Sequence, residues 1–145
     1  MPFLPTTVLV ATDGSESSRA ALLAAVDLCR ATSSPLHLVH AKSTSPTLRG
    51  RPMTPGQRTA TEDEGEQLLK REAEAAADAG WEVEGTHLRH GDSADRVIGQ
   101  VQAELGAGLL VVAAGRSGSV AGRLLRPTGA GTVRRAPGSV LVVRA

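Results

Sequence analysis

The chain has 145 residues, a formal net charge of +1 and only two aromatic residues, Phe3 and Trp81. This length suits one domain, which we place over residues 1–145, and the near-neutral charge gives little attraction to nucleic acid or membranes. The scarcity of aromatic side chains also argues against single-strand binding by base stacking, so neither nucleic acid nor a membrane is an expected partner.

The only cysteine is Cys29, so no internal disulfide can form, which fits a reducing compartment. The first seven residues lack the charged segment and the apolar run of a signal peptide. No stretch approaches the roughly 20 apolar residues that a membrane-spanning helix needs. We therefore expect a cytoplasmic protein.

The first elements are a strand, a helix and a second strand. Val8–Ala11 is a short apolar run, which predicts a buried strand that ends in a turn. Helical periodicity follows over Ser17–Ala31, where Asp13 or Ser15 is placed to cap the free N–H groups. Leu36–Ala41 predicts the second strand.

The middle of the chain predicts a loop, a helix and an edge strand. Lys42–Ala60 holds three prolines and two glycines, so we expect a loop there. Thr61–Glu64 has the spacing of a capping box, and the helix that it opens should run to Ala79. Trp81–Leu88 alternates between apolar and polar residues, which is typical of a strand at a sheet edge.

The last third predicts two more helices and two more strands. A third helix begins after Gly91 and carries an apolar stripe to Leu105. Leu109–Ala113 is a fully apolar strand, and a segment rich in glycine and serine follows it. A short helix over Thr128–Arg135 and a final strand over Val140–Val143 complete the pattern.

Strands and helices alternate along the whole chain, which predicts a mostly parallel sheet with helices on both faces. Ligands of such sheets bind beyond the carboxyl ends of the strands, at the point where the strand order reverses. Two loops are expected at that point, Thr12–Ser15 and Ala113–Arg126.

Five segments, spread over nearly the whole chain, carry a resemblance to a known family: Val8–Ser15, Leu38–Ala41, Gly91–Asp92, Gly106–Val112 and Arg135–Val143. In these segments the sequence resembles the universal stress protein family. The resemblance implies a Rossmann-like, HUP-type α/β fold, with a five-stranded parallel sheet in the order 3-2-1-4-5. It also implies a role in stress responses and a dimer that is joined along the last strand.

Many members of that family bind ATP or AMP, which implies a candidate adenine nucleotide site here. The family's adenine-contacting Asp corresponds to Asp13, next to Thr12, and a second position that lines the base corresponds to Ala41. The family holds phosphates in a loop of the pattern Gly-x2-Gly-x9-Gly-Ser/Thr after the fourth strand, where glycines let backbone N–H groups approach. The candidate site residues are Thr12, Asp13, Ala41, Gly115, Arg116, Gly118 and Arg126.

The phosphate loop departs from the family pattern. Without gaps, its positions fall on Ala113, Arg116, Arg126 and Pro127, so every glycine is replaced and proline has no N–H to donate. A shifted reading recovers glycines at 115, 118 and 129, but it changes the spacing to the last strand. Either the two arginines hold phosphate through their side chains, or the phosphate site is lost.

Other chemistry has little support in the sequence. His37 with His87, and His40 with His90, could be neighbours if the second and third strands pair. A zinc site needs three or four converging ligands, so we expect no metal. No histidine is positioned as a base for the serines near Asp13, so an enzyme is not expected.

The sequence therefore predicts a non-enzymatic, dimeric stress-response module that requires no cofactor and binds nucleotide weakly or not at all. Its expected partners are a second copy, through the apolar strand Val140–Val143, and other proteins. The alternative is a nucleotide sensor that binds ATP or AMP between Asp13 and the loop with Arg116 and Arg126.

Overall fold

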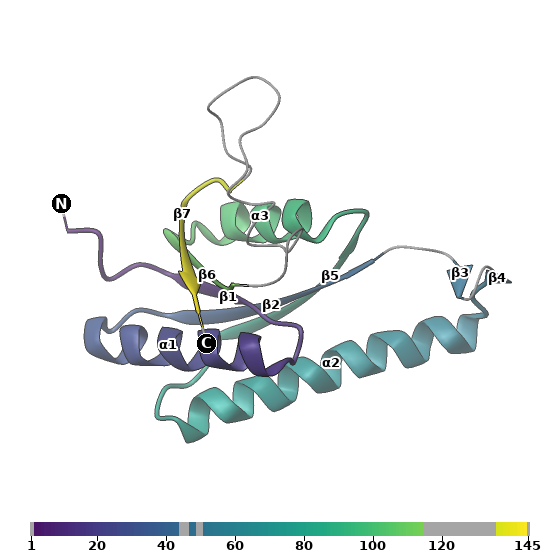
Figure 1. Cartoon of the computed structure of the whole chain (residues 1–145), viewed down its shortest axis with the longest axis horizontal. Helices are drawn as coiled ribbons and strands as arrows, with labels where there is room; N and C mark the ends of the chain where they lie inside the picture. The colour runs from purple at the N-terminus through teal and green to yellow at the C-terminus, as the bar shows by residue number, and fades with distance from the viewer. Residues whose placement is uncertain (1, 44–46, 49–50, 115–135, 145) are drawn as a thin grey trace.

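The computed structural model describes residues 2–43, 47–48, 51–114 and 136–144. Five strands form one sheet in the order β5-β2-β1-β6-β7, and every neighbouring pair is parallel (Figure 1). Counted within this sheet, that is the predicted order 3-2-1-4-5, which is confirmed. The sheet strands are β1 Val8–Ala11, β2 Leu36–Ser43, β5 Gly85–Gly91, β6 Leu109–Ala113 and β7 Ser139–Val143. The helices are α1 Glu16–Thr32, α2 Pro55–Asp78 and α3 Ala94–Leu105.

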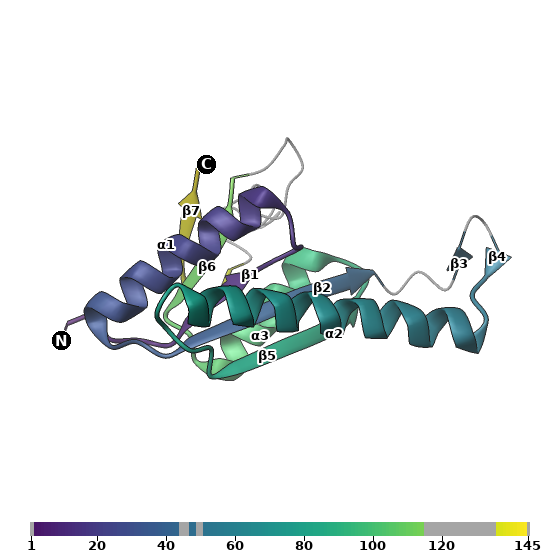
Figure 2. The same cartoon turned by 90° about the horizontal axis from the view of Figure 1, so that it is seen from below.

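Helices cover both faces of the sheet. Val8 and Val10 of β1 pack in one apolar cluster with residues of α1 and α2, whereas Leu9 packs with Ile98 and Val101 of α3. Figures 1 and 2 show α1 and α2 together on one side of the sheet and α3 on the other. Strands β1 and β6 are apolar at every position because both of their faces are covered.

Helix α1 begins and ends at clear local signals. The Ser15 side chain accepts a hydrogen bond from the backbone N–H of Ser18, which makes Ser15 the N-cap. Ser33 adopts a left-handed conformation with φ of 59° and ends the helix. The prediction of a helix over Ser17–Ala31 with a cap near Ser15 is confirmed.

Helix α2 begins earlier than predicted. Thr54 is its N-cap, because the Thr54 side chain accepts from the N–H of Gln57 and the Gln57 side chain accepts from the N–H of Thr54. The expected loop over Lys42–Ala60 and the expected helix start at Thr61–Glu64 were therefore wrong. The short antiparallel strands β3 (Thr47–Leu48) and β4 (Arg51–Pro52) lie before this helix, and with the first turns of α2 they project beyond the sheet (Figure 2).

The predicted edge strand is shifted along the chain. It was expected over Trp81–Leu88, but β5 covers Gly85–Gly91. Trp81 instead packs against the cluster of α1 and α2, and its Nε1 donates to the Ser34 carbonyl oxygen at 3.1 Å. Where β5 ends, a Cβ atom on Gly91 would overlap Cγ2 of Val97, so this glycine lets the strand lie directly against α3.

The helices differ in how much of their surface is covered. Among the described helices α2 is the longest, with 24 residues, of which Gly65, Leu69, Glu72 and Ala76 are buried. The rest of α2 is largely polar and exposed. Across the described part of the chain, no helix has both the length and the apolar character to cross a membrane.

Candidate functional site

The candidate site lies where the strand order reverses, beyond the carboxyl ends of β1 and β6. From β1 the chain continues to β2 on one side, whereas β6 continues to β7 on the other. Such a reversal leaves a crevice between neighbouring loops, which is where parallel α/β sheets bind ligands. Thr12, Asp13 and Gly14 directly follow β1, and Ala114 follows β6, donating to the Val143 carbonyl oxygen at 2.8 Å.

Hydroxyl groups fix the turn between β1 and α1. Oγ1 of Thr12 lies 3.2 Å from Oγ of Ser18 and accepts from the N–H of Gly14 at 3.2 Å. Oγ of Ser18 donates to the Ser15 carbonyl oxygen at 3.0 Å. Gly14 has φ of +79°, and a Cβ there would lie 3.0 Å from Cδ1 of Leu68, so α2 closes over this turn. Thr12 is thus a buried anchor of the turn.

Asp13 is exposed, and its carboxylate bonds to the N-cap residue of α1, Ser15. One carboxylate oxygen accepts from the N–H of Ser15 at 2.9 Å. Burial tends to raise the pKa of Asp13, but hydrogen bonds from the side chain and backbone of Ser15 and from Ser18 outweigh it, and the net pKa is lowered. Asp13 therefore places a negative charge at the positive end of the helix dipole.

Strand β2 holds the same turn from the other side. The N–H of Thr12 donates to the Val39 carbonyl oxygen at 2.9 Å, and Nδ1 of His40 donates to the Thr12 carbonyl oxygen at 2.8 Å. Ala41 follows directly and packs in the same cluster as Ala11. The structure thus brings three of the predicted site residues together at the carboxyl ends of β1 and β2: Thr12, Asp13 and Ala41.

His40 was not predicted as part of the site. The strand register pairs His40 with Leu88 and His90 with Lys42. His40 and His90 thus lie two positions apart on paired strands, and their contact stays a prediction. The signal that could have identified His40 is its position as the histidine that closes the second apolar strand, beside the end of the first.

The other predicted site residues are not described by the structure. Gly115, Arg116, Gly118 and Arg126, together with the predicted helix Thr128–Arg135, lie outside the described residues. The phosphate half of the candidate site thus remains a prediction from sequence.

One histidine pair does form. Nδ1 of His37 lies 3.1 Å from Nε2 of His87, which confirms the expected contact between the second and third strands of the sheet. Burial lowers the pKa of His87, as do His37 and Arg89, while Glu104 opposes them. Within the described ranges, no group of three or more His, Cys, Asp or Glu residues could hold a metal ion.

Comparison with known proteins decides the family. Residues 5–144, nearly the whole chain, match the universal stress protein family. The chain belongs to this family. Among curated proteins, no sequence shows a significant match to it.

Solved universal stress proteins share this fold over nearly their full length. One from Burkholderia pseudomallei is 27% identical with a TM-score of 0.73, covering 97% of this chain and 96% of the other. A universal stress protein solved in complex with cAMP is 28% identical with a TM-score of 0.66, covering 95% and 96% of the two chains. A universal stress protein from Archaeoglobus fulgidus in complex with dAMP is 22% identical with a TM-score of 0.64, covering 94% and 96%.

Proposed function

We propose that this universal stress protein is a non-enzymatic regulatory module of the cytoplasm that acts as a dimer through protein contacts. In this proposal it requires no cofactor and binds adenine nucleotides weakly or not at all. The observation that carries the proposal is the sequence of the loop after β6, where Arg116 and Pro127 stand at positions that the family pattern gives to glycine and Ser/Thr.

The charge of Asp13 bears directly on phosphate binding. A helix N-terminus at a topological switch point attracts phosphate because its N–H groups are unpaired and its dipole is positive. Here Asp13 lies next to the N-cap residue Ser15, and its lowered pKa keeps the carboxylate negative. A phosphate at α1 would therefore meet a like charge, and the loop after β6 has Arg116 and Pro127 where the family pattern has glycine and Ser/Thr.

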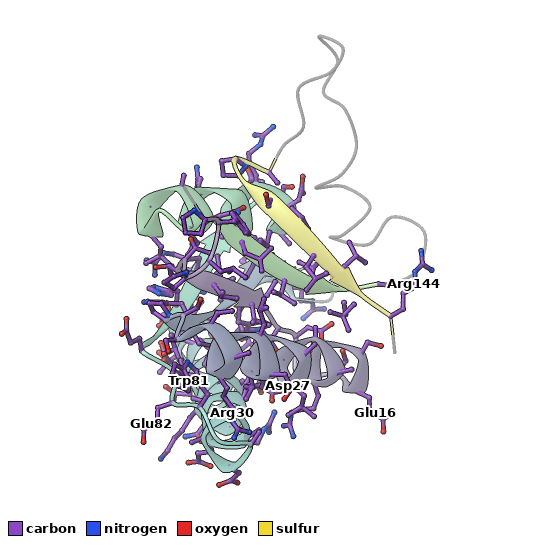
Figure 3. The ribbon with its side chains drawn as sticks, turned by 90° about the vertical axis from the view of Figure 1, so that its left-hand side faces the viewer. Glu16, Asp27, Arg30, Trp81, Glu82 and Arg144 are labelled. Atoms are coloured by element: carbon purple, nitrogen blue, oxygen red, sulfur yellow. The ribbon has the colours of Figure 1, made fainter. Side chains whose placement is uncertain are left out.

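The dimer is proposed at β7. Within the described residues this strand pairs with β6 alone, and Figure 3 shows it along the edge of the sheet, with Arg144 beyond its end. Leu141, in the middle of β7, is a large apolar residue that is 40% exposed. An exposed apolar edge strand recruits a partner, and a second copy of β7 offers the same apolar surface.

Two measurements test this proposal. Calorimetric titration with AMP, ATP and cAMP should give no binding, or binding only in the millimolar range, and no ATP hydrolysis should exceed that of a mock preparation. Sedimentation at micromolar concentration should give a dimer that Leu141→Lys converts to a monomer, while Leu23→Lys, at an exposed position of α1, leaves it intact. Micromolar nucleotide affinity would overturn the nucleotide-free function, and a monomeric wild-type protein would overturn the dimer.

The second candidate function is nucleotide sensing. It is favoured by the turn at Thr12 and Asp13, which the Val39 carbonyl and His40 hold in a defined position, and by the similarity to a universal stress protein in complex with cAMP. In this function Asp13 and Ala41 contact the base, and Arg116 or Arg126 contacts phosphate.

Nucleotide sensing predicts specific changes in AMP affinity when the site residues are substituted. Asp13→Ala should weaken AMP binding at least about tenfold, as expected when a hydrogen bond to a charged group is lost. Arg126→Ala should make the remaining affinity less dependent on salt, because a charge contact is removed. Glu16→Ala, at an exposed residue of the first turn of α1, is the matched control and should bind as the wild type does. Unchanged affinity in both site variants would exclude this function.

A further inference from the structure

A histidine pair lies at the edge of the sheet, on the face opposite α1 and α2. His37 is on β2, where it pairs directly with Gly85 of β5. His87 lies two residues further along β5. Neither side chain is fully exposed, and β5 pairs only with β2 among the described strands. Nδ1 of His37 and Nε2 of His87 are 3.1 Å apart. The two nitrogens thus meet between two partly buried rings, one on the edge strand and one on its neighbour.

The spacing of these nitrogens suits one metal ion. A zinc ion binds imidazole nitrogen at about 2.0–2.1 Å, so two such ligands on one ion stand about 2.9–3.4 Å apart at the usual angles. The observed separation of 3.1 Å lies within that interval. Ni²⁺ and Cu²⁺ also favour imidazole ligands. Both nitrogens therefore could bind one ion without a shift of the strands.

Gly85 leaves room next to both nitrogens. It is paired directly with His37, and a Cβ at this position would lie 2.9 Å from Nδ1 of His37 and 3.5 Å from Nε2 of His87. Any side chain at residue 85 would occupy the space beside the two nitrogens. The glycine therefore leaves a small cradle between the rings.

A carboxylate lies near the first ring. Oε2 of Glu84 is 3.6 Å from Nε2 of His37, so its negative charge favours a proton on that nitrogen. With the proton on Nε2, Nδ1 of His37 keeps its lone pair for a metal ion. Across the pair, Glu104 of α3 lies near His87 and also forms an ion pair with Arg89.

We propose that His37 and His87 form a two-histidine site for a divalent transition metal ion, with Zn²⁺, Ni²⁺ and Cu²⁺ as the ions that it accepts. The ion replaces the proton between the rings. That proton moves from Nε2 to Nδ1 of His87 through solvent, and both rings turn so that their lone pairs meet at the metal over Gly85. Water fills the remaining coordination positions. This site is independent of whether the protein binds nucleotide.

The test is calorimetric titration of the untagged full-length protein with ZnCl₂ and with NiCl₂. One ion should bind per chain, and Cu²⁺ should bind more tightly than either, as its place in the Irving–Williams order requires. His37→Asn and His87→Asn should each lower the affinity at least about tenfold, because a single imidazole remains. His90→Asn is the matched control, since His90 is an exposed histidine on the same strand but on its other face, and it should bind as the wild type does.

A second variant keeps the test decisive if a histidine substitution prevents folding. Gly85→Ala retains both imidazoles but places a methyl group in the cradle, so it should also lower the affinity at least about tenfold while the circular dichroism of the protein is preserved. In the wild type, the Cε1–H resonances of His37 and His87 should shift on addition of Zn²⁺, and that of His90 should not. Absence of binding by the wild type, or wild-type affinity in the variants of His37, His87 and Gly85, would overturn the proposal.

Discussion

Arg19 of α1 and Glu72 of α2 join the two helices on one face of the sheet through a single ion pair. Nε of Arg19 lies 2.6 Å from Oε2 of Glu72. The Glu72 side chain is 1% exposed, whereas that of Arg19 is 43% exposed. The carboxylate is therefore the member of the pair that has lost its water, and it depends on the guanidinium for its charge to be tolerated.

Removal of the arginine should consequently destabilise the protein strongly. We expect Arg19→Met to lower the free energy of unfolding by about 3 kcal/mol, since it leaves a buried carboxylate without its partner. The double variant Arg19→Met/Glu72→Met should recover most of that loss, because no buried charge remains. Lys70→Met, at an exposed position of α2, is the control. Urea unfolding measures all three variants, and equal losses in Arg19→Met and Lys70→Met would contradict the role of the pair.

Asp13 should make the stability depend on acid pH. Its pKa in the folded protein is below the ordinary value of 3.8, so the folded state binds fewer protons than the unfolded state as the pH falls through that region. The stabilisation is present above about pH 4 and is lost as the pH falls through 3.8 to the folded pKa. Asp13→Asn should remove this part of the dependence in urea unfolding from pH 3 to pH 7. Asp27→Asn, at an exposed position of α1, serves as the control and should retain it.

Cys29 should be chemically inert in the folded protein. It is fully buried, and burial raises the pKa of its thiol to about 11. Because the thiolate is the reactive form, iodoacetamide at pH 8 should leave the native protein unmodified by mass spectrometry. The same reagent should modify the protein fully in denaturant. Rapid modification under native conditions would show that α1 opens away from the sheet.

Gln102 should hold the start of β7 to the end of α3. Its Nε2 donates to the carbonyl oxygens of Ala107 at 3.1 Å and Ser139 at 3.3 Å, and its side chain is buried. Gln102→Glu would direct a carboxylate at those two carbonyl oxygens, so we expect a larger loss than in Gln102→Met. The loss in Gln102→Met should be about 1–3 kcal/mol, the usual effect of unpaired buried acceptors. Urea unfolding gives both values, and a smaller loss in the glutamate variant would contradict this role.

The sequence predicted the central strands β1 and β6 more accurately than the start of helix α2. Val8–Ala11 and Leu109–Ala113 are apolar throughout because helices cover both faces, and this pattern is hard to mistake. The start of α2 was missed because Pro55 and Gly56 resemble loop residues, although proline is favoured in the first turn of a helix. Thr61–Glu64 repeats the spacing of a helix start inside the helix, so spacing alone could not distinguish the two positions.

Half of the candidate site could be placed from sequence. Thr12 and Asp13 lie at the end of the first strand, so the switch point of the sheet located them. The bond from His40 to the Thr12 carbonyl depends on the register of β1 against β2, which the sequence does not specify. Gly85 was overlooked for the same reason, since its importance appears only when it is paired with His37.

The close approach of Gly91 to Val97 limits how this protein can diverge. A Cβ at residue 91 would overlap Cγ2 of Val97, so a larger residue at 91 requires a smaller one at 97 or an outward movement of α3. Substitutions at residues 91 and 97 should accordingly be coupled. Related sequences that lose Gly91 are expected to have alanine in place of Val97. Those that keep Gly91 can vary at residue 97 among side chains of similar volume.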